Sequence, residues 1–200
     1  MDIQTTIEGI TPIMFSRFTA ENEADVDCTN RPVFSGEKDT PREEAFKKLY
    51  INGDSEVSIP GPNIFAAIID AGKFIKLGRK QITTTVTSLV PAGITINELN
   101  CPILNKDEEN IPCNSNGWEV DSRSVVNQAT RGRIMSHRPR VDEWKIKFTM
   151  DIDEELFSEK VVRQLVDYAG KRCGIGVFRP NRKGPFGKFV VTKWKRNVTH

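Results

Sequence analysis

The chain has 200 residues, of which 38% are hydrophobic, so one domain can bury a core without a disulfide framework. No apolar run is long enough to span a membrane, and the first residues lack the basic and apolar segments of a signal peptide. We therefore expect a cytoplasmic protein with no membrane partner. The four cysteines form no CxxC pair and there are only two histidines, which argues against a metal site, and no motif predicts a cofactor.

The net charge is only +2, but the charges are segregated along the chain. Acidic residues gather in residues 19–56, whereas basic residues dominate 73–80, 131–140 and 171–196. Such segregation predicts one positive face, although each cluster would also suit an ordinary solvated surface.

The N-terminal part predicts a strand followed by a long insertion. Ile3, Thr5 and Ile7 alternate with polar residues, which is the period of a half-buried strand. Residues 19–56 form a polar run that we interpret as a lateral, partly helical insertion. Within it, Thr40 is a good N-cap and Pro41 suits a first helical position, so a short helix is expected to begin there.

The middle of the chain predicts a helix and an interrupted strand. Apolar residues recur at helical spacing from Ile64 to Ile75 and Gly78 supplies a stop, which predicts a helix of about sixteen residues. Residues 81–96 are rich in Thr, Val and Ile and predict a strand broken at Pro91. Residues 97–130 show no sustained period, and we interpret them as a second long insertion with a hairpin near 114–118.

The C-terminal part predicts a strand, a helix and a last strand. Residues 133–151 are expected to be extended, with clean alternation from Trp144 to Met150. A helix from Phe157, capped by Ser158 and ended by Gly170 or Gly174, precedes a strand at 187–194. We therefore expect residues 1–200 to form a single α+β domain. When the two insertions are set aside, the order of its elements is that of a ferredoxin-like, RRM-like βαββαβ core. The open sheet face of this fold commonly binds RNA.

The segment from Gly170 to Trp194 is the strongest functional candidate. It holds five of the fourteen glycines, and from Lys171 onward the chain has nine Lys or Arg residues and no carboxylate. Glycines allow close approach of the backbone to a ligand, arginines suit phosphate oxygens, and Phe178 or Phe186 could stack on a base. In the opposing interpretation the phenylalanines belong to the core and the glycines only shape turns.

A second basic segment, RGRIMSHRPR at residues 131–140, precedes the best-patterned strand and is predicted to line the same groove. A charged edge strand is the alternative. The basic residues in 73–80 are explained more simply as helix-dipole partners on a wet surface. The predicted nucleic-acid-binding residues are Arg131, Arg133, His137, Arg138, Arg140, Arg172, Gly174, Gly176, Arg179, Arg182, Lys183, Gly184, Phe186, Gly187 and Lys188.

Three segments resemble the RAMP superfamily of CRISPR-associated proteins, especially the repeated backbone subunit that coats guide RNA. IEGITPIMFSRF resembles the family's first strand, IPGPNIFAAIIDAGKF its entry to the first helix, and GIGVFRPNRKGPFGKF its glycine-rich loop. The likeness covers roughly residues 1–18, 57–96 and 131–195. It departs from the family at Asn63, Ile64 and Phe65, where Ser, Leu and Lys are usual. The chain also resembles phage and prophage proteins, which adds no activity.

The resemblance implies a non-catalytic subunit that binds single-stranded RNA, such as a guide RNA. It further implies a filament or ring of copies along the strand, contacts with other CRISPR-type subunits, and a thumb formed by residues 97–130. Alternatives are a phage protein that binds single-stranded DNA in replication or recombination, and an assembly protein that polymerises without nucleic acid. A ribonuclease is the remaining alternative, with His137, or an aspartate such as Asp25, Asp27 or Asp121 with a metal, as its candidate residue.

Overall fold

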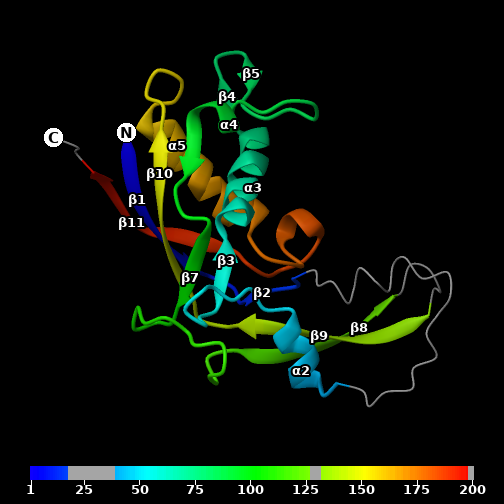
Figure 1. The fold of residues 1–200 in the computed structure, drawn as a ribbon. Helices are drawn as coiled ribbons and strands as arrows, with labels where there is room; N and C mark the ends of the chain where they lie inside the picture. The colour runs from blue at the N-terminus through cyan, green and yellow to red at the C-terminus, as the bar shows by residue number, and fades with distance from the viewer. Residues whose placement is uncertain (18–38, 127–131, 198–200) are drawn as a thin grey trace.

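The computed structural model describes residues 1–17, 39–126 and 132–197. Its centre is a six-stranded sheet in the order β11-β1-β10-β7-β3, with β6 also paired to β10 (Figure 1). The pairings within this sheet are antiparallel. The strands are β1 (Asp2–Gly9), β3 (Ser58–Pro60), β6 (Ile94–Ile96), β7 (Asn100–Leu104), β10 (Lys145–Ile152) and β11 (Phe189–Asn197). Within the described ranges, no helix is long and apolar enough to cross a bilayer.

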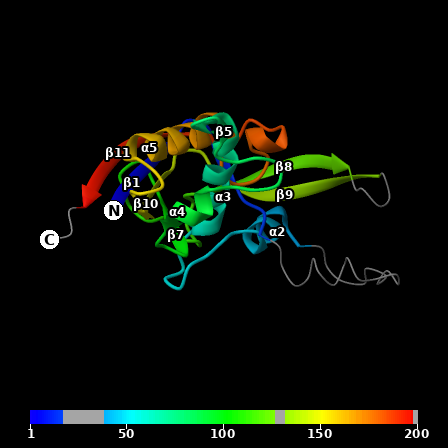
Figure 2. The ribbon, with the colours of Figure 1, turned by 90° about the horizontal axis from the view of Figure 1, so that it is seen from above.

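Two helices, α3 (Gly61–Ala71) and α5 (Glu159–Tyr168), pack on one face of this sheet (Figure 2). The alternation predicted for β10 explains why, because Ile146, Phe148 and Met150 are fully buried under the helices while Lys147 points to the other face. The strand order places β11 beside β1 and β10 between β1 and the β6–β7 pair. This is the ferredoxin-like arrangement, and it confirms the predicted fold class.

The start of α3 depends on a glycine. The Gly61 N–H donates to the Leu99 carbonyl at 2.8 Å, and a Cβ at Gly61 would overlap the Glu98 carbonyl oxygen. Close contact between the helix start and the β6–β7 corner therefore requires a residue without a side chain.

The helix predicted from Ile64 to Ile75 ends earlier than the sequence indicates. The α-helix ends at Ala71, the turn η1 (Gly72–Phe74) follows, and Ile75 returns to the core. The strands β4 (Lys76–Leu77) and β5 (Lys80–Gln81) then form a hairpin. Gly78, with a φ of 63°, serves the turn of this hairpin and not a helix stop.

Most of the strand predicted over residues 81–96 is also wrong, because the threonine hydroxyls hold turns. Thr84 Oγ1 accepts a hydrogen bond from the Thr87 N–H at 3.0 Å, and the Thr83 and Ser88 hydroxyls lie 2.8 Å apart. Such local side-chain hydrogen bonds compete with a sheet ladder. A single helical turn, α4 (Val90–Gly93), follows, and only β6 is a strand of the main sheet.

A second sheet extends to one side of the first (Figure 1). It pairs β2 (Ile13–Met14) with β9 (Arg133–Val141), and β9 with β8 (Glu119–Val126). Residues 97–130, which we interpreted as an insertion with a hairpin near 114–118, contribute β7 and β8. The position of that hairpin is wrong, because residues 114–118 form turns and the hairpin is made by β8 and β9. The extended stretch predicted over 133–151 is divided between the two sheets by a turn after Val141.

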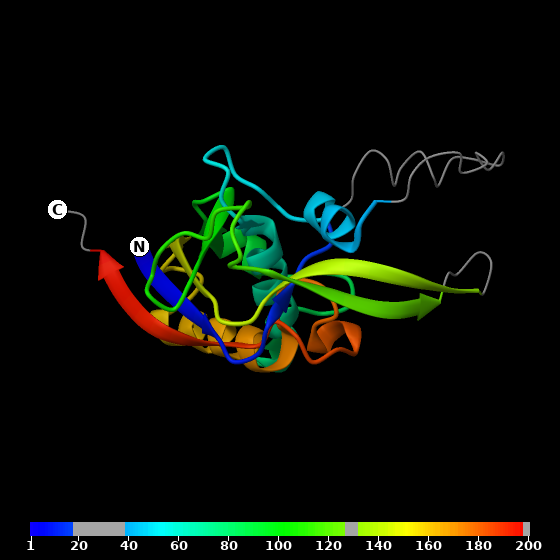
Figure 3. The same ribbon diagram turned by 90° about the horizontal axis from the view of Figure 1, so that it is seen from below.

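Helix α2 (Pro41–Lys47) begins where predicted, with Thr40 and Glu43 forming a capping box. It packs on one side of the β8–β9 hairpin, and the turn η3 (Pro180–Arg182) lies on the other side (Figure 3). Residues 19–38 of the predicted first insertion lie outside the described residues.

The contact at Gly61 gives a stability prediction. Gly61→Ala should lower the free energy of unfolding by about 1–3 kcal/mol, because the new methyl group must displace the backbone of the β6–β7 corner. Urea denaturation monitored by circular dichroism would measure it. Gly53→Ala is the matched control, since a Cβ there meets no atom within 4 Å, and it should stay within about 0.5 kcal/mol of wild type. Equal effects of the two substitutions would contradict the prediction.

Candidate nucleic-acid interface

The glycine-rich loop, residues 174–188, lies along β2 and is held there by backbone hydrogen bonds. The Val177 N–H donates to the Met14 carbonyl at 2.9 Å, and the Gly187 N–H donates to the Pro12 carbonyl at 2.8 Å. Because β2 also pairs with β9, these bonds fix the loop beside the base of the β8–β9 hairpin.

The glycines of this loop allow backbone to meet backbone. Gly174, Gly176 and Gly187 have φ angles of 70°, 77° and 71°, a region that residues with a side chain rarely adopt. A Cβ at Gly184 would overlap the Phe178 carbonyl oxygen, and one at Gly187 would overlap that of Ile175. The predicted alternative, in which the glycines shape turns, describes these contacts, so any ligand chemistry belongs to the side chains.

The cations of the loop differ in how far they are engaged. Arg179 donates from Nη1 to the Gly176 carbonyl at 2.7 Å, so its side chain helps to close the loop. Arg182 and Lys183 are exposed, and neither side chain has a partner within the described residues. They follow Asn181, whose side chain donates to the Asp70 carboxylate of α3 and so anchors the turn.

The β8–β9 hairpin has two different faces. One, which we call the loop face, carries Glu119, Asp121 and Arg123 of β8 opposite Arg140, Arg138 and Ser136 of β9. The ring of Phe186 in the glycine-rich loop lies 5.0 Å from the Arg123 guanidinium, which shows that this face meets the loop. The opposite face carries Ser122 and His137, and it contacts α2.

The two aromatic residues predicted to stack on a base lie side by side, with ring centroids 6.0 Å apart. Phe186 is only 8% exposed, so its ring packs inside and is not free to stack; that part of the prediction is wrong. Phe178 is 38% exposed, although its ring lies beside that of Phe186. Phe178 is therefore the ring that a base can reach.

Two of the three arginines on the loop face form ion pairs with carboxylates. Asp121, which is 6% exposed, pairs with Arg123 and with Arg140, and the hydrogen bond from Arg123 lowers the pKa of this carboxyl. Arg140 also pairs with Glu119 at 2.7 Å and Asp142 at 2.6 Å. By contrast, the Arg138 Nε is buried and has no hydrogen-bond partner among the described residues.

The remaining predicted residues are dispersed. Arg131 lies outside the described residues, and Arg133 is exposed toward the end of the hairpin. Arg172 stacks on Tyr168 and Phe74 at 4.3 and 4.7 Å, near the β4–β5 hairpin. Lys188 is half-buried, and its N–H donates to the Thr11 hydroxyl.

His137 faces α2 and not the loop. Its Nδ1 lies 2.6 Å from the Ser122 hydroxyl, and its Nε2 lies 3.9 Å from a Glu44 carboxylate oxygen. Its backbone carbonyl accepts a hydrogen bond from Lys48 Nζ at 2.9 Å. The predicted set thus divides between two faces, with Arg138 and Arg140 beside the loop and His137 behind the hairpin.

Arg123 is not among the residues predicted from the sequence. It lies in residues 97–130, where no hydrophobic period marked a strand, so nothing placed its side chain opposite Ser136. Asp121 and Arg123 alternate on β8, and Arg138 and Arg140 alternate on the facing strand β9. These alternations place the four side chains on one face only once the pairing register of the two strands is known.

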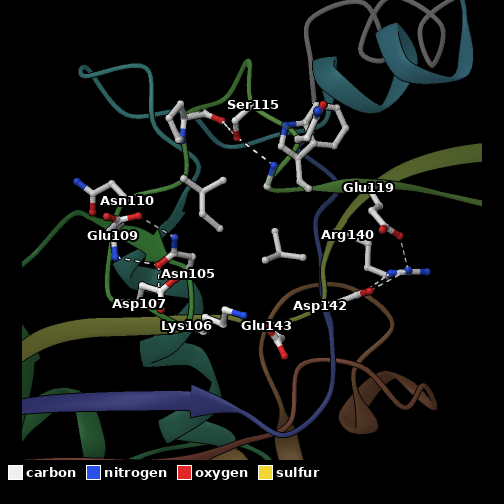
Figure 4. A pocket seen from close by; sticks show the side chains of 16 residues that line it. Asn105, Lys106, Asp107, Glu109, Asn110, Ser115, Glu119, Arg140, Asp142 and Glu143 are labelled. Atoms are coloured by element: carbon white, nitrogen blue, oxygen red, sulfur yellow. Dashed lines mark hydrogen bonds and ion pairs between the residues drawn. The ribbon is translucent and has the colours of Figure 1, made fainter.

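A hollow of about 880 Å³ lies between the β7–β8 connection and the β9–β10 turn (Figure 4). Five of the sixteen residues that line it are acidic and two are basic, so it carries an excess of negative charge; the acidic residues are Asp107, Glu109, Glu119, Asp142 and Glu143. Such a surface repels phosphate, so it is not a candidate for nucleic-acid binding.

The described residues offer little to metal or thiol chemistry. No group of three or more His, Cys, Asp or Glu side chains within them could hold a metal ion. Burial raises the pKa of Cys101 to about 12 and that of Cys173 to about 11, so both thiols stay protonated at neutral pH.

The comparisons with known proteins concern the fold. No family model matches the chain, and neither does any curated protein. The structure resembles a chain of the Type III-B Cmr-beta assembly, solved by cryo-electron microscopy bound to cognate target RNA, with a TM-score of 0.56 and 10% sequence identity. The match covers 97% of this chain and 59% of the other, so this chain spans about three fifths of that protein's length. At this identity the likeness shows a shared fold.

The lowered pKa of Asp121 gives a prediction on acid stability. A carboxyl with a pKa below its ordinary value of 3.8 stabilises the fold above that pH, and the contribution is lost as the pH falls through the folded-state pKa. Asp121→Asn should therefore lower the free energy of unfolding at neutral pH, and its difference from wild type should shrink below about pH 4.

Urea denaturation at a series of pH values would measure this difference. Asp54→Asn is the control, because Asp54 is exposed and has no ion pair within the described residues. A difference between wild type and Asp121→Asn that stays constant from neutral to strongly acidic pH would contradict the assignment.

Proposed function

We propose that this protein is a non-catalytic RNA-binding subunit of a CRISPR-type ribonucleoprotein complex. In this proposal it binds single-stranded RNA, such as a guide RNA, at the surface between the glycine-rich loop and the loop face of the β8–β9 hairpin. Copies of the chain then lie side by side along the strand and meet other subunits of the complex.

The observation that carries the proposal is that two basic segments, the β8–β9 hairpin and the glycine-rich loop, are in contact. Arg138 comes from the hairpin, Arg182 and Lys183 from the loop, and Phe178 lies on the same loop. The contact between Arg123 and Phe186 holds hairpin and loop together. Cations with free donors beside an exposed ring are the elements of a sequence-tolerant site for single-stranded nucleic acid.

Each side chain has a distinct role in the proposed complex. Arg138 is half-buried, and its guanidinium has no carboxylate partner among the described residues, so its charge would attract a phosphate. Arg182 and Lys183 neutralise neighbouring phosphates from the solvent side. Phe178 stacks on a base, which requires an unpaired strand and so favours single-stranded over duplex RNA.

The fold comparison supports RNA as the ligand and other protein subunits as partners. The similar chain belongs to a Cmr-beta assembly bound to target RNA, and the likeness extends over nearly all of this chain. The segments that resembled the RAMP backbone subunit are β1 with β2, the entry to α3 and the glycine-rich loop. The first and last of these adjoin the proposed surface.

The absence of catalysis is part of the proposal. His137 lies on the face of the hairpin that contacts α2, behind the proposed RNA surface. Asp121 is paired with two arginines, which favours a structural carboxylate over a metal ligand. Neither residue is positioned to transfer a proton to or from an RNA strand at this surface.

The binding surface can be tested with a short fluorescein-labelled RNA and fluorescence anisotropy. Arg138→Ala should weaken binding by about 1–3 kcal/mol, and the double substitution Arg182→Ala with Lys183→Ala should also reduce the salt dependence of the affinity. Lys160→Ala is the matched control, because Lys160 is exposed on α5, outside the proposed surface. The proposal fails if Arg138→Ala and the double variant both bind like wild type.

The same measurement with DNA of identical sequence separates the RNA proposal from a single-stranded DNA-binding protein. We expect tighter binding of RNA, because a guide-binding subunit contacts the 2′-hydroxyl groups. Equal affinity for the two polymers would favour the alternative function in replication or recombination.

A cleavage assay tests the non-catalytic role. Wild type and His137→Ala, incubated with end-labelled RNA with and without Mg²⁺, should both leave the RNA intact on a denaturing gel. His137→Ala should nevertheless lower the melting temperature, because it removes the contact with Ser122. Cleavage by wild type that disappears in the variant would establish a ribonuclease instead.

A further inference from the structure

On the face of the main sheet that the helices leave open, cations of β10 and β11 lie on either side of β1. The pairing register places Thr6 of β1 between Lys147 of β10 and Lys193 of β11. One pair further along β1, Gln4 lies opposite Lys195. Gln4, Thr6, Lys147, Lys193 and Lys195 line a hollow of about 520 Å³ on this face.

One carboxylate from a distant segment bridges Lys147 of β10 and Lys193 of β11. Glu108, in the loop that follows β7, places Oε2 2.6 Å from Lys147 Nζ and Oε1 2.7 Å from Lys193 Nζ. Since β1 lies between β10 and β11, the carboxylate sits above Thr6, and this loop crosses β1 (Figure 3). The two lysines therefore converge on a single two-oxygen anion.

The loop does not need this contact to keep its shape. The Asn105 side chain accepts hydrogen bonds from the Asp107 and Glu109 N–H groups, at 2.8 and 3.0 Å, and Lys145 donates to the Lys106 carbonyl at 2.9 Å. The Glu108 side chain can therefore leave the lysines while the loop stays folded.

The ion pairs are also open to exchange. The side chains of Lys147 and Lys193 are 44% and 61% exposed, and that of Glu108 is 32% exposed. Ion pairs at such exposure contribute little net free energy, because water and salt compete with them. A phosphodiester presents two non-bridging oxygens to the same pair of donors and brings neighbouring phosphates with it.

We propose that Lys147 and Lys193 form a second phosphate-binding site for the RNA strand, which the Glu108 carboxylate occupies in the free protein. This inference rests on the proposed RNA-binding function and extends the contact from the hairpin onto the open sheet face. The incoming phosphate displaces Glu108, so the carboxylate lowers the affinity of this site and restricts it to a polyanion that is already held nearby.

The test uses the full chain, the labelled RNA and a series of KCl concentrations. Glu108→Gln should tighten RNA binding about three- to tenfold at moderate salt and steepen the dependence of affinity on salt concentration, because two cations become available. Adding Lys147→Ala and Lys193→Ala to this variant should abolish the gain.

Asp107→Asn is the matched control. It removes the same charge from the adjacent position, but the Asp107 side chain has no ion pair within the described residues and lines the acidic hollow instead. It should change the affinity for RNA less than about twofold, since it alters only the long-range electrostatic potential, which salt screens. Melting temperatures near that of wild type would establish that the variants are folded.

The outcomes separate this inference from the function on which it rests. An equal gain from Glu108→Gln and Asp107→Asn would show a general charge effect and overturn the second site. Unchanged or weaker binding by Glu108→Gln, with Arg138→Ala still impaired, would also overturn it while leaving the RNA-binding function intact. Absence of RNA binding by wild type and by every variant would overturn both.

Discussion

The proposed binding surface depends on the two-residue strand β2, which is hydrogen-bonded to both the glycine-rich loop and the hairpin. Ile13 and Met14 pair with Val141 and Arg140 of β9, and the Met14 carbonyl also accepts the Val177 N–H of the glycine-rich loop. Loop and hairpin are far apart in the sequence, but each is bonded to the same short backbone segment. A shift of β2 would therefore separate the cations of the loop from those of the hairpin, whatever their side chains.

The glycines of the loop allow its backbone to lie close enough to β2 for these hydrogen bonds. Sequence reasoning assigned them to the close approach of a ligand, whereas Gly184 and Gly187 allow the loop to fold onto its own carbonyl groups and onto Pro12. The result is a loop held by its backbone at both ends. Binding to such a loop costs little backbone conformational freedom, which favours a fixed path for the ligand over an adaptable one.

The sequence predicted the elements that bury a face and missed those that do not. The alternation of β10, the apolar spacing of α3 and the capping residues of α2 each reflect contact with the core, so the ferredoxin-like order followed from them. β8 projects from the core and has polar residues on both faces, since Arg123 meets the loop and Ser122 meets His137. No hydrophobic period can mark such a strand. The end of α3 and the threonine-rich turns were missed for another reason, because local hydrogen bonds overrode residue propensity.

The two proposed sites differ in how far carboxylates already engage their cations. Glu108 pairs with Lys147 and Lys193 on the sheet, so a phosphate there must replace an ion pair. On the loop face Asp121 pairs with Arg123 and Arg140, whereas Arg138, Arg182 and Lys183 have no carboxylate partner among the described residues. Affinity at a single site is then modest, while contacts along one strand add up. The proposed pair of sites would therefore favour a long polyanion, which engages both at once, over a small anion.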